Sequence, residues 1–158
     1  MIKGIHHTSF TVSNLESAQR FFIDLMGMKR VGGGTYAFDY IRRSVGYSDA
    51  TLKVAVLCSA GYQPGDPLLE LIEYIHPRGD PVETSTNRPG NAHVCFVVSD
   101  IDTEVKRLQT AGVSFKSPTA NEVTWGINKG AKSIYFNGPD DIALELIEPR
   151  QTSTQKDS

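Results

Sequence analysis

The fold is decided by the stretch Asn91-Ala92-His93-Val94-Cys95-Phe96-Val97-Val98-Ser99-Asp100. Its β-branched and aromatic residues predict a strand. Because side chains alternate along a strand, His93, Cys95 and Val97 are expected on one face. Ser99 follows the strand and is typical of a helix N-cap, so we expect a helix to begin directly after it. One histidine on a strand is more often structural than functional, so its meaning depends on whether the pattern recurs.

The pattern does recur near the start of the chain, in Ile5-His6-His7-Thr8-Ser9-Phe10-Thr11-Val12-Ser13-Asn14. His7 and Ser13 each stand 86 residues before their counterparts. A closing strand recurs as well, since Leu69-Glu70-Leu71-Ile72-Glu73 matches Leu144-Glu145-Leu146-Ile147-Glu148 at an offset of 75. Landmarks repeated in the same order predict an internal repeat, with about eleven extra residues in the first copy.

Each copy of the repeat is predicted as a βαβββ module. Module one spans residues 4–75, module two spans residues 91–149, and the proline-rich segment 76–90 is the linker between them. We therefore predict an α+β fold in which two tandem modules form a curved mixed sheet around a cleft, within one domain over residues 1–149. Residues 150–158 are polar and predict a flexible C-terminal tail.

Strand parity divides the carboxylates of the two closing strands between two faces. Glu70 and Glu145 are expected on one face of their strands. Glu73 and Glu148 fall on the opposite face, where we predict that they are exposed to solvent. His6 also points to that opposite face, and no role is assigned to it.

Composition excludes several classes of function. With 158 residues, 39% hydrophobic and 22% charged, the chain is expected to form an ordinary globular domain. A net charge of −2 argues against binding to nucleic acid or to an anionic membrane surface, and no apolar run approaches the roughly 20 residues of a membrane helix. Cys58 and Cys95 lie in apolar strands, so we predict two buried thiols. Together with the lack of a signal peptide, this favours a cytoplasmic protein.

The chain resembles the vicinal oxygen chelate superfamily, which includes glyoxalase I, methylmalonyl-CoA epimerase, extradiol dioxygenases and the fosfomycin and bleomycin resistance proteins. The resemblance covers residues 4–149. It rests on His7 with its strand and helix start, Leu69-Glu70-Leu71, the run from His93 to Leu108, and Gly138-Pro139-Asp140 leading to Leu144-Glu145-Leu146.

The resemblance implies a metal site. In this superfamily the first and last strands of each half carry metal ligands, and the matching positions here are His7, Glu70, His93 and Glu145. Two imidazoles and two carboxylates suit one divalent ion such as Mn, Fe, Co, Ni or Zn. Four protein ligands on a six-coordinate ion would leave two positions for water or substrate oxygens, so the cleft is expected to be a metal-binding cleft.

The resemblance also implies a type of reaction. Glu145 is the first candidate for the base that removes a proton next to a carbonyl, Glu70 is the second, and the metal would stabilise the enolate. The expected function is a metal-dependent isomerase, epimerase or lyase on a small oxygenated compound, nearest to glyoxalase I and methylmalonyl-CoA epimerase. The epimerase typically has glutamine at the position of Glu70. The alternatives are an Fe(II) extradiol-type dioxygenase that uses His7, His93 and Glu145, and a non-catalytic small-molecule binding or resistance protein.

Further residues are candidates for contacts with the substrate. By parity Ser9, Tyr74 and Cys95 are expected to line the cleft, and Trp125 is a candidate substrate wall in the loop 117–130. The expected partner is a small-molecule substrate. Resemblance also implies a homodimer, and the cleft forms either within one chain or between two.

Overall fold

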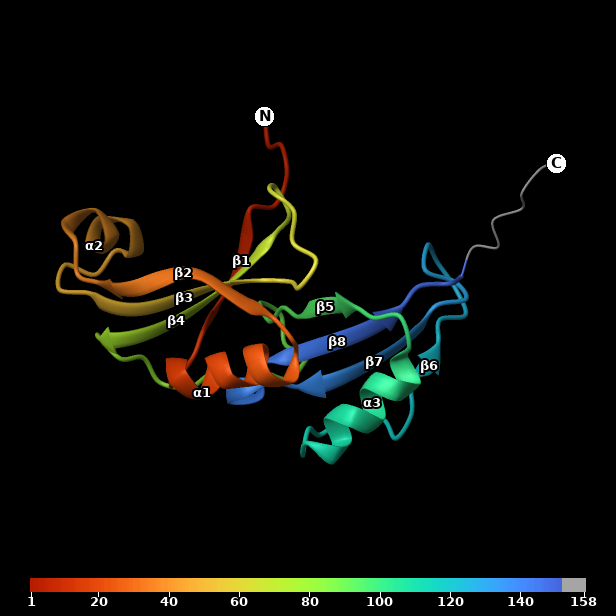
Figure 1. Ribbon diagram of the computed structural model, residues 1–158. Coiled ribbons are helices and arrows are strands. Elements are labelled where there is room, and N and C mark those ends of the chain that lie inside the picture. The colour runs from red at the N-terminus through yellow and green to blue at the C-terminus, as the bar shows by residue number, and fades with distance from the viewer. Residues whose placement is uncertain (152–158) are drawn as a thin grey trace. The chain divides into compact units, whose positions relative to one another are not determined.

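The computed structural model describes residues 1–151, which form two compact units (Figure 1). The first unit is Met1–Val82 and the second begins at Glu83, so the boundary falls inside the predicted linker, residues 76–90. The predicted tail, residues 150–158, lies almost entirely outside the described residues. Among residues 1–151 there is no helix with the length and apolar character needed to span a membrane.

The first unit is a mixed sheet with the strand order β1-β4-β3-β2. Its strands are β1 (His7–Thr11), β2 (Lys29–Tyr36), β3 (Thr51–Cys58) and β4 (Leu68–His76). Its helices are α1 (Leu15–Arg20), which continues into a π-helix over Phe21–Leu25, and α2 (Asp39–Val45). The strands β1 and β4 pair in parallel, whereas β3 is antiparallel to both β4 and β2.

The second unit repeats this plan with the strand order β5-β8-β7-β6. Its elements are β5 (Val94–Val97), α3 (Ile101–Thr110), β6 (Asn121–Glu122), β7 (Lys132–Asn137), a 3₁₀ turn over Pro139–Asp141 and β8 (Ala143–Glu148). Again the outer strand, β5, is parallel to its neighbour β8, and β7 is antiparallel to β8. Within the described part of the chain, the predicted α+β fold of two βαβββ modules is confirmed, and α2 is an addition to the first.

One face of each sheet packs against the helix of its own unit (Figure 1). In the first unit the helical segment buries Leu15, Ala18 and Phe22, and alternate residues of β4, Leu69 and Leu71, are buried with them. The second unit follows the same rule, and its buried residues include Ile101, Val105, Leu108, Ile134, Phe136, Leu144 and Leu146. This alternation leaves the intervening residues of β4 and β8 on the face away from the helix.

The second glutamate of each closing strand is not exposed to solvent as predicted. Glu73 is only 8% exposed and accepts hydrogen bonds from the backbone N–H of Leu15 and from Arg78, both at 3.0 Å. Glu148 accepts a hydrogen bond from the backbone N–H of Ile101 at 2.8 Å. The prediction was wrong because these residues face the start of the helix of their own unit, where the first N–H groups have no partner within the helix.

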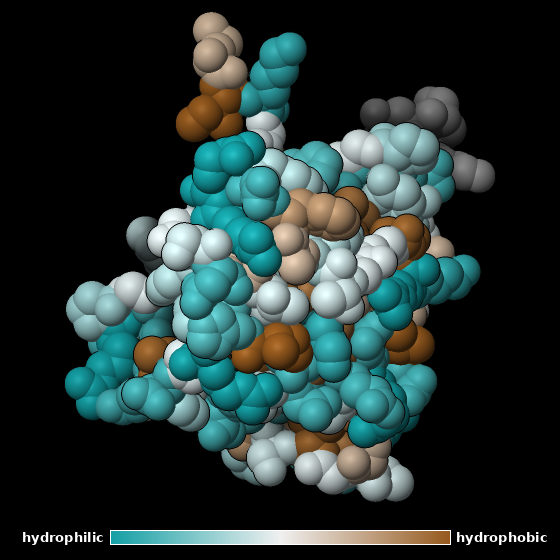
Figure 2. Space-filling view, turned by 90° about the vertical axis from the view of Figure 1, so that its left-hand side faces the viewer, coloured by the Kyte–Doolittle hydropathy of each residue, from teal (hydrophilic) through white to brown (hydrophobic). Residues whose placement is uncertain are grey.

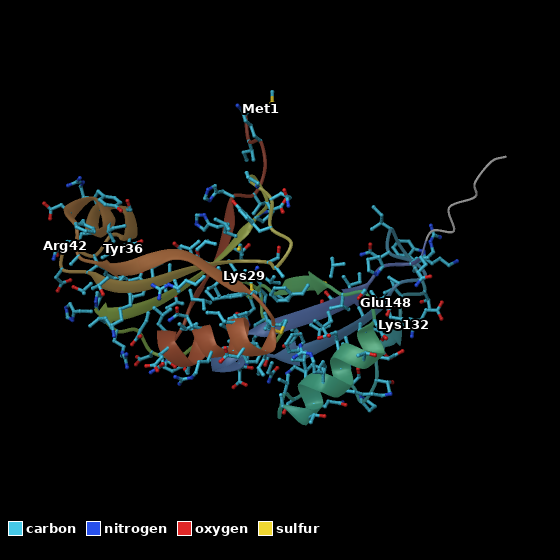
Figure 3. The ribbon with its side chains drawn as sticks, in the orientation of Figure 1. Met1, Lys29, Tyr36, Arg42, Lys132 and Glu148 are labelled. Carbon is cyan, nitrogen blue, oxygen red and sulfur yellow. The ribbon has the colours of Figure 1, made fainter. Side chains whose placement is uncertain are left out.

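Replacing Glu73 by alanine is expected to destabilise the protein by about 2–3 kcal/mol, because the buried N–H of Leu15 and the guanidinium of Arg78 both lose a charged acceptor. Denaturant unfolding followed by circular dichroism measures this change. Glu148→Ala is the matched substitution, at a less buried residue beside Lys132 of β7 (Figure 3). It should cost less, and equal losses would contradict the importance of burial at Glu73.

The helices begin one residue later than predicted. The N-caps are Asn14 and Asp100, which follow the predicted caps Ser13 and Ser99. Asn14 accepts a hydrogen bond from the backbone N–H of Ser17 at 2.9 Å, and Asp100 has the equivalent bond at 2.9 Å. Both residue types are favoured N-caps, so the side chain that lies nearer the first helical turn takes the role.

The cap at Asp100 predicts a specific sensitivity to acid. The backbone N–H and then the hydroxyl of Thr103 hold the pKa of Asp100 below its ordinary value of 3.8. Because the folded pKa is depressed, the stabilisation is present above pH 3.8 and is lost as the pH falls through the folded pKa. Asp100→Asn retains an acceptor without the charge, so its melting temperature should fall less than that of the wild type between about pH 5 and pH 2.5. An identical acid dependence in the two proteins would contradict this assignment.

Candidate metal centre

The first histidine–glutamate pair lies in the first unit. His7 begins β1, and Glu70 lies on the face of β4 that does not pack against α1. The Nε2 atom of His7 is 3.8 Å from the Oε2 atom of Glu70. Ser9 stands opposite Glu70 in the parallel ladder, and its hydroxyl donates a hydrogen bond to the same Oε2 atom at 2.7 Å. The strand that carries the histidine therefore also orients the carboxylate.

His6, to which no role was assigned, contacts the candidate ligand His7. Their Nδ1 atoms are 2.9 Å apart, and the rings meet edge to face with centroids 5.2 Å apart. His6 precedes β1, so strand parity does not govern its direction. A hydrogen bond at Nδ1 leaves Nε2 of His7 free to face Glu70. Such a bond is typical of metal-binding histidines, which are oriented through the second ring nitrogen.

The second pair lies in the second unit and is tighter. His93 directly precedes β5, and Glu145 lies on β8. The Nε2 atom of His93 is 3.2 Å from Oε2 of Glu145. Cys95 stands opposite Glu145 on β5, in the position that Ser9 has in the first unit, and Tyr135 stands opposite Glu145 on β7. The hydroxyl oxygen of Tyr135 is 3.0 Å from Nε2 of His93.

Two protonated side chains surround the carboxylate of Glu145. Burial, the negative charge of Glu145 and a hydrogen bond to it raise the pKa of Cys95 to about 12. The same causes, burial first, raise the pKa of Tyr135 above its usual value. Near neutral pH both groups are therefore neutral donors, which argues against a thiolate nucleophile at Cys95. The prediction that this thiol is buried was wrong, because Cys95 lies on the less covered face of the sheet and is exposed, so the burial that raises its pKa is only partial.

Each pair fits two neighbouring ligands of one divalent ion. With metal–nitrogen and metal–oxygen bonds of about 2.0–2.2 Å, neighbouring ligand atoms lie about 3.0–3.5 Å apart and opposite ones up to about 4.3 Å apart. The separation of 3.2 Å matches neighbouring ligands, and the separation of 3.8 Å lies slightly above that range. Over residues 1–151, His, Cys, Asp and Glu side chains do not gather in groups of three or more that could hold a metal. Each unit by itself therefore offers two ligands.

Two further residues, Tyr74 and Trp125, were predicted to contact the substrate. Tyr74 is on the Glu70 face of β4, and its ring meets that of Tyr47 edge to face with centroids 6.1 Å apart. Trp125 is 86% exposed in the loop between β6 and β7. On the face drawn in Figure 2, hydrophobic residues are scattered among hydrophilic ones.

Tyr135 is the residue of the second pair that the sequence prediction missed. Its importance depends on the register between β7 and β8, which places it opposite Glu145. In the first unit the corresponding position, opposite Glu70, is Val56. An internal repeat that differs at this position gives no sequence signal for a shared role.

Comparisons with known proteins agree with the fold. A family model described as the Glyoxalase/Bleomycin resistance protein/Dioxygenase superfamily matches residues 4–146. The chain is 26% identical over 147 residues to a 2-epi-5-epi-valiolone epimerase of Actinomyces sp, covering 91% of this chain and 78% of that enzyme. It is 23% identical over 158 residues to the lactoylglutathione lyase of Schizosaccharomyces pombe, covering 94% of this chain and 48% of that enzyme. A glyoxalase family protein from Bacillus cereus has a similar structure, with a TM-score of 0.79, 22% identity, and coverage of 96% of this chain and 97% of that one.

Proposed function

The chain belongs to the Glyoxalase/Bleomycin resistance protein/Dioxygenase superfamily, and we propose that it is a metal-dependent isomerase, epimerase or lyase acting on a small oxygenated compound. The observation that carries the proposal is the histidine–glutamate pair that each unit forms, His7 with Glu70 and His93 with Glu145. We propose that all four side chains bind one divalent ion of Mn, Fe, Co, Ni or Zn, from one chain or from two. An epimerase and a lyase among the relatives support this class of reaction.

The proposed reaction begins with removal of a proton from the carbon next to a carbonyl. A bound divalent ion would polarise that carbonyl and make the neighbouring C–H group more acidic. Glu145 is the proposed base, and Glu70 is the second candidate. The thiol of Cys95 donates to Glu145 and so helps to hold its carboxylate in one orientation. Ser9 does the same for Glu70.

Metal analysis is the first test of this proposal. Protein purified without chelators is expected to contain about one divalent ion per site, and an added ion of the right type should raise the melting temperature of the metal-free protein. His7→Ala and His93→Ala should each remove most of this shift. If no ion is bound and none of the five metals changes the melting temperature, the proposal is wrong.

Hydrogen exchange with solvent is the test of the reaction type. Carbonyl compounds incubated with the metal-loaded protein in D₂O should take up deuterium at the carbon next to the carbonyl, and NMR or mass spectrometry detects it. Oxygen consumption with catechols and Fe(II) would instead support the dioxygenase alternative. Tight binding of a compound without exchange or turnover would support a binding protein.

We further propose that Ser9, Tyr74, Cys95 and Trp125 contact the substrate and that the protein is a homodimer. Tyr74 and Trp125 have aromatic rings suited to an apolar part of the substrate, while Ser9 and Cys95 adjoin the carboxylates. Light scattering after gel filtration tests the dimer. A monomer at micromolar concentration would mean that both pairs must serve one ion within a single chain.

A further inference from the structure

The hydroxyl of Tyr135 lies within hydrogen-bond distance of Nε2, the nitrogen through which His93 would bind a metal. Its oxygen is 3.0 Å from Nε2 of His93, and the same Nε2 atom is 3.2 Å from Oε2 of Glu145. A metal binds imidazole through the lone pair of a ring nitrogen that carries no proton. When Nε2 carries no proton, the O–H group of Tyr135 donates to that same lone pair. Tyr135 and a metal therefore compete for one atom of His93.

The hydroxyl is a specific feature of the second pair rather than a requirement of the fold. Tyr135 stands opposite Glu145 in the ladder between β7 and β8. Val56 holds the equivalent position opposite Glu70, between β3 and β4. The same sheet position thus accommodates a side chain without a polar atom. In the first unit the hydroxyl opposite the glutamate is that of Ser9, on the other neighbouring strand, and it donates to Glu70.

Tyr135 has a second acceptor when its bond to His93 is broken. The carboxylate of Glu145 stands opposite Tyr135 in the ladder and can accept its hydroxyl proton instead, and the ring of Tyr135 is tilted by 59° against the ring of His93, with centroids 5.0 Å apart. Rotation about the C–O bond can therefore turn the hydroxyl proton from Nε2 toward Glu145 while the tyrosine ring keeps its place. The displaced hydroxyl still has an acceptor, so displacement loses only the hydrogen bond between Tyr135 and His93.

We propose that Tyr135 is a positioning residue that holds His93 in the metal-free protein and is displaced from Nε2 when a divalent ion binds, so that it weakens the affinity of the site for metal. The inference rests on the proposed function, because it takes His93 as a metal ligand. The pair of His93 and Glu145 is therefore the half of the site that must rearrange when the metal ion binds.

Tyr135→Phe is the test. Losing one net hydrogen bond that competes with the ion should tighten the binding of Zn²⁺ or Co²⁺ by about two- to tenfold, measured by competition with a chromophoric chelator. Tyr62→Phe, at a tyrosine in the turn before β4, is the matched control and should bind like the wild type. In metal-free protein, long-range ¹H–¹⁵N NMR should show a shift of the ring nitrogens of His93 in Tyr135→Phe and none for His7.

The outcomes separate this inference from the proposed function. Unchanged or weaker binding by Tyr135→Phe, together with weaker binding by His93→Ala, would overturn the competition alone. If the wild type binds no ion, or His93→Ala binds as tightly as the wild type, the metal site fails and the competition fails with it. Tyr135→Val, which copies the residue at position 56, gives the same test if the phenylalanine variant does not fold.

Discussion

Replacing Glu145 by glutamine is expected to abolish turnover and to lower the affinity for divalent metal by more than about 100-fold. That loss is larger than the one expected when a residue that only hydrogen-bonds to a metal ligand is replaced. The neutral amide is a poorer ligand than the carboxylate whose Oε2 atom lies 3.2 Å from Nε2 of His93. It also cannot accept the proton of the substrate. Chelator competition measures the affinity, and deuterium exchange from D₂O measures the chemistry.

Glu148→Gln is the matched control for this variant. Glu148 lies on the same strand, but its carboxylate accepts the backbone N–H of Ile101 instead of facing His93. The glutamine oxygen can still accept that bond, so metal affinity and exchange should stay close to the wild-type values. Equal losses in Glu145→Gln and Glu148→Gln would mean that the strand, and not the carboxylate at position 145, determines activity.

The pairing of histidine with glutamate was predictable from the sequence. Strand alternation separated Glu70 and Glu145 from Glu73 and Glu148, and the resemblance to the vicinal oxygen chelate superfamily grouped them with His7 and His93. The structure places each histidine next to the glutamate of its own unit. The same alternation placed Glu73 on the other face correctly. It could not show that the start of α1 covers this residue, because burial depends on which element packs there.

The surroundings of the second pair were not predictable for a related reason. Tyr135 meets Glu145 through the register of two antiparallel strands, and a shift of one residue would point its ring to the opposite face. The first residue of a helix was also not predictable from the sequence. Ser99 and Asp100 are both favoured N-caps, and the geometry of the first turn selects Asp100.

Replacing Gly33 by alanine is expected to destabilise the first unit by at least about 3 kcal/mol. Gly33 has φ +109°, a conformation that side chains strongly disfavour, and a Cβ atom there would lie 2.1 Å from the carbonyl oxygen of Val54. It would also lie 2.8 Å from Cα of Ala55. These atoms belong to the backbone of β3, so the clash is relieved only by moving β2 away from the strand with which it pairs.

Gly34→Ala separates this clash from the general effect of a larger residue in β2. Its Cβ would meet Cε1 of Tyr36 at 3.6 Å, an ordinary contact, and its φ is not positive. Its stability should stay within about 1 kcal/mol of the wild type in denaturant unfolding. Because β3 pairs with β4, which carries Glu70, Gly33→Ala should also weaken metal binding, whereas Gly34→Ala should not. Equal unfolding midpoints for the two variants would show that β2 can shift without cost.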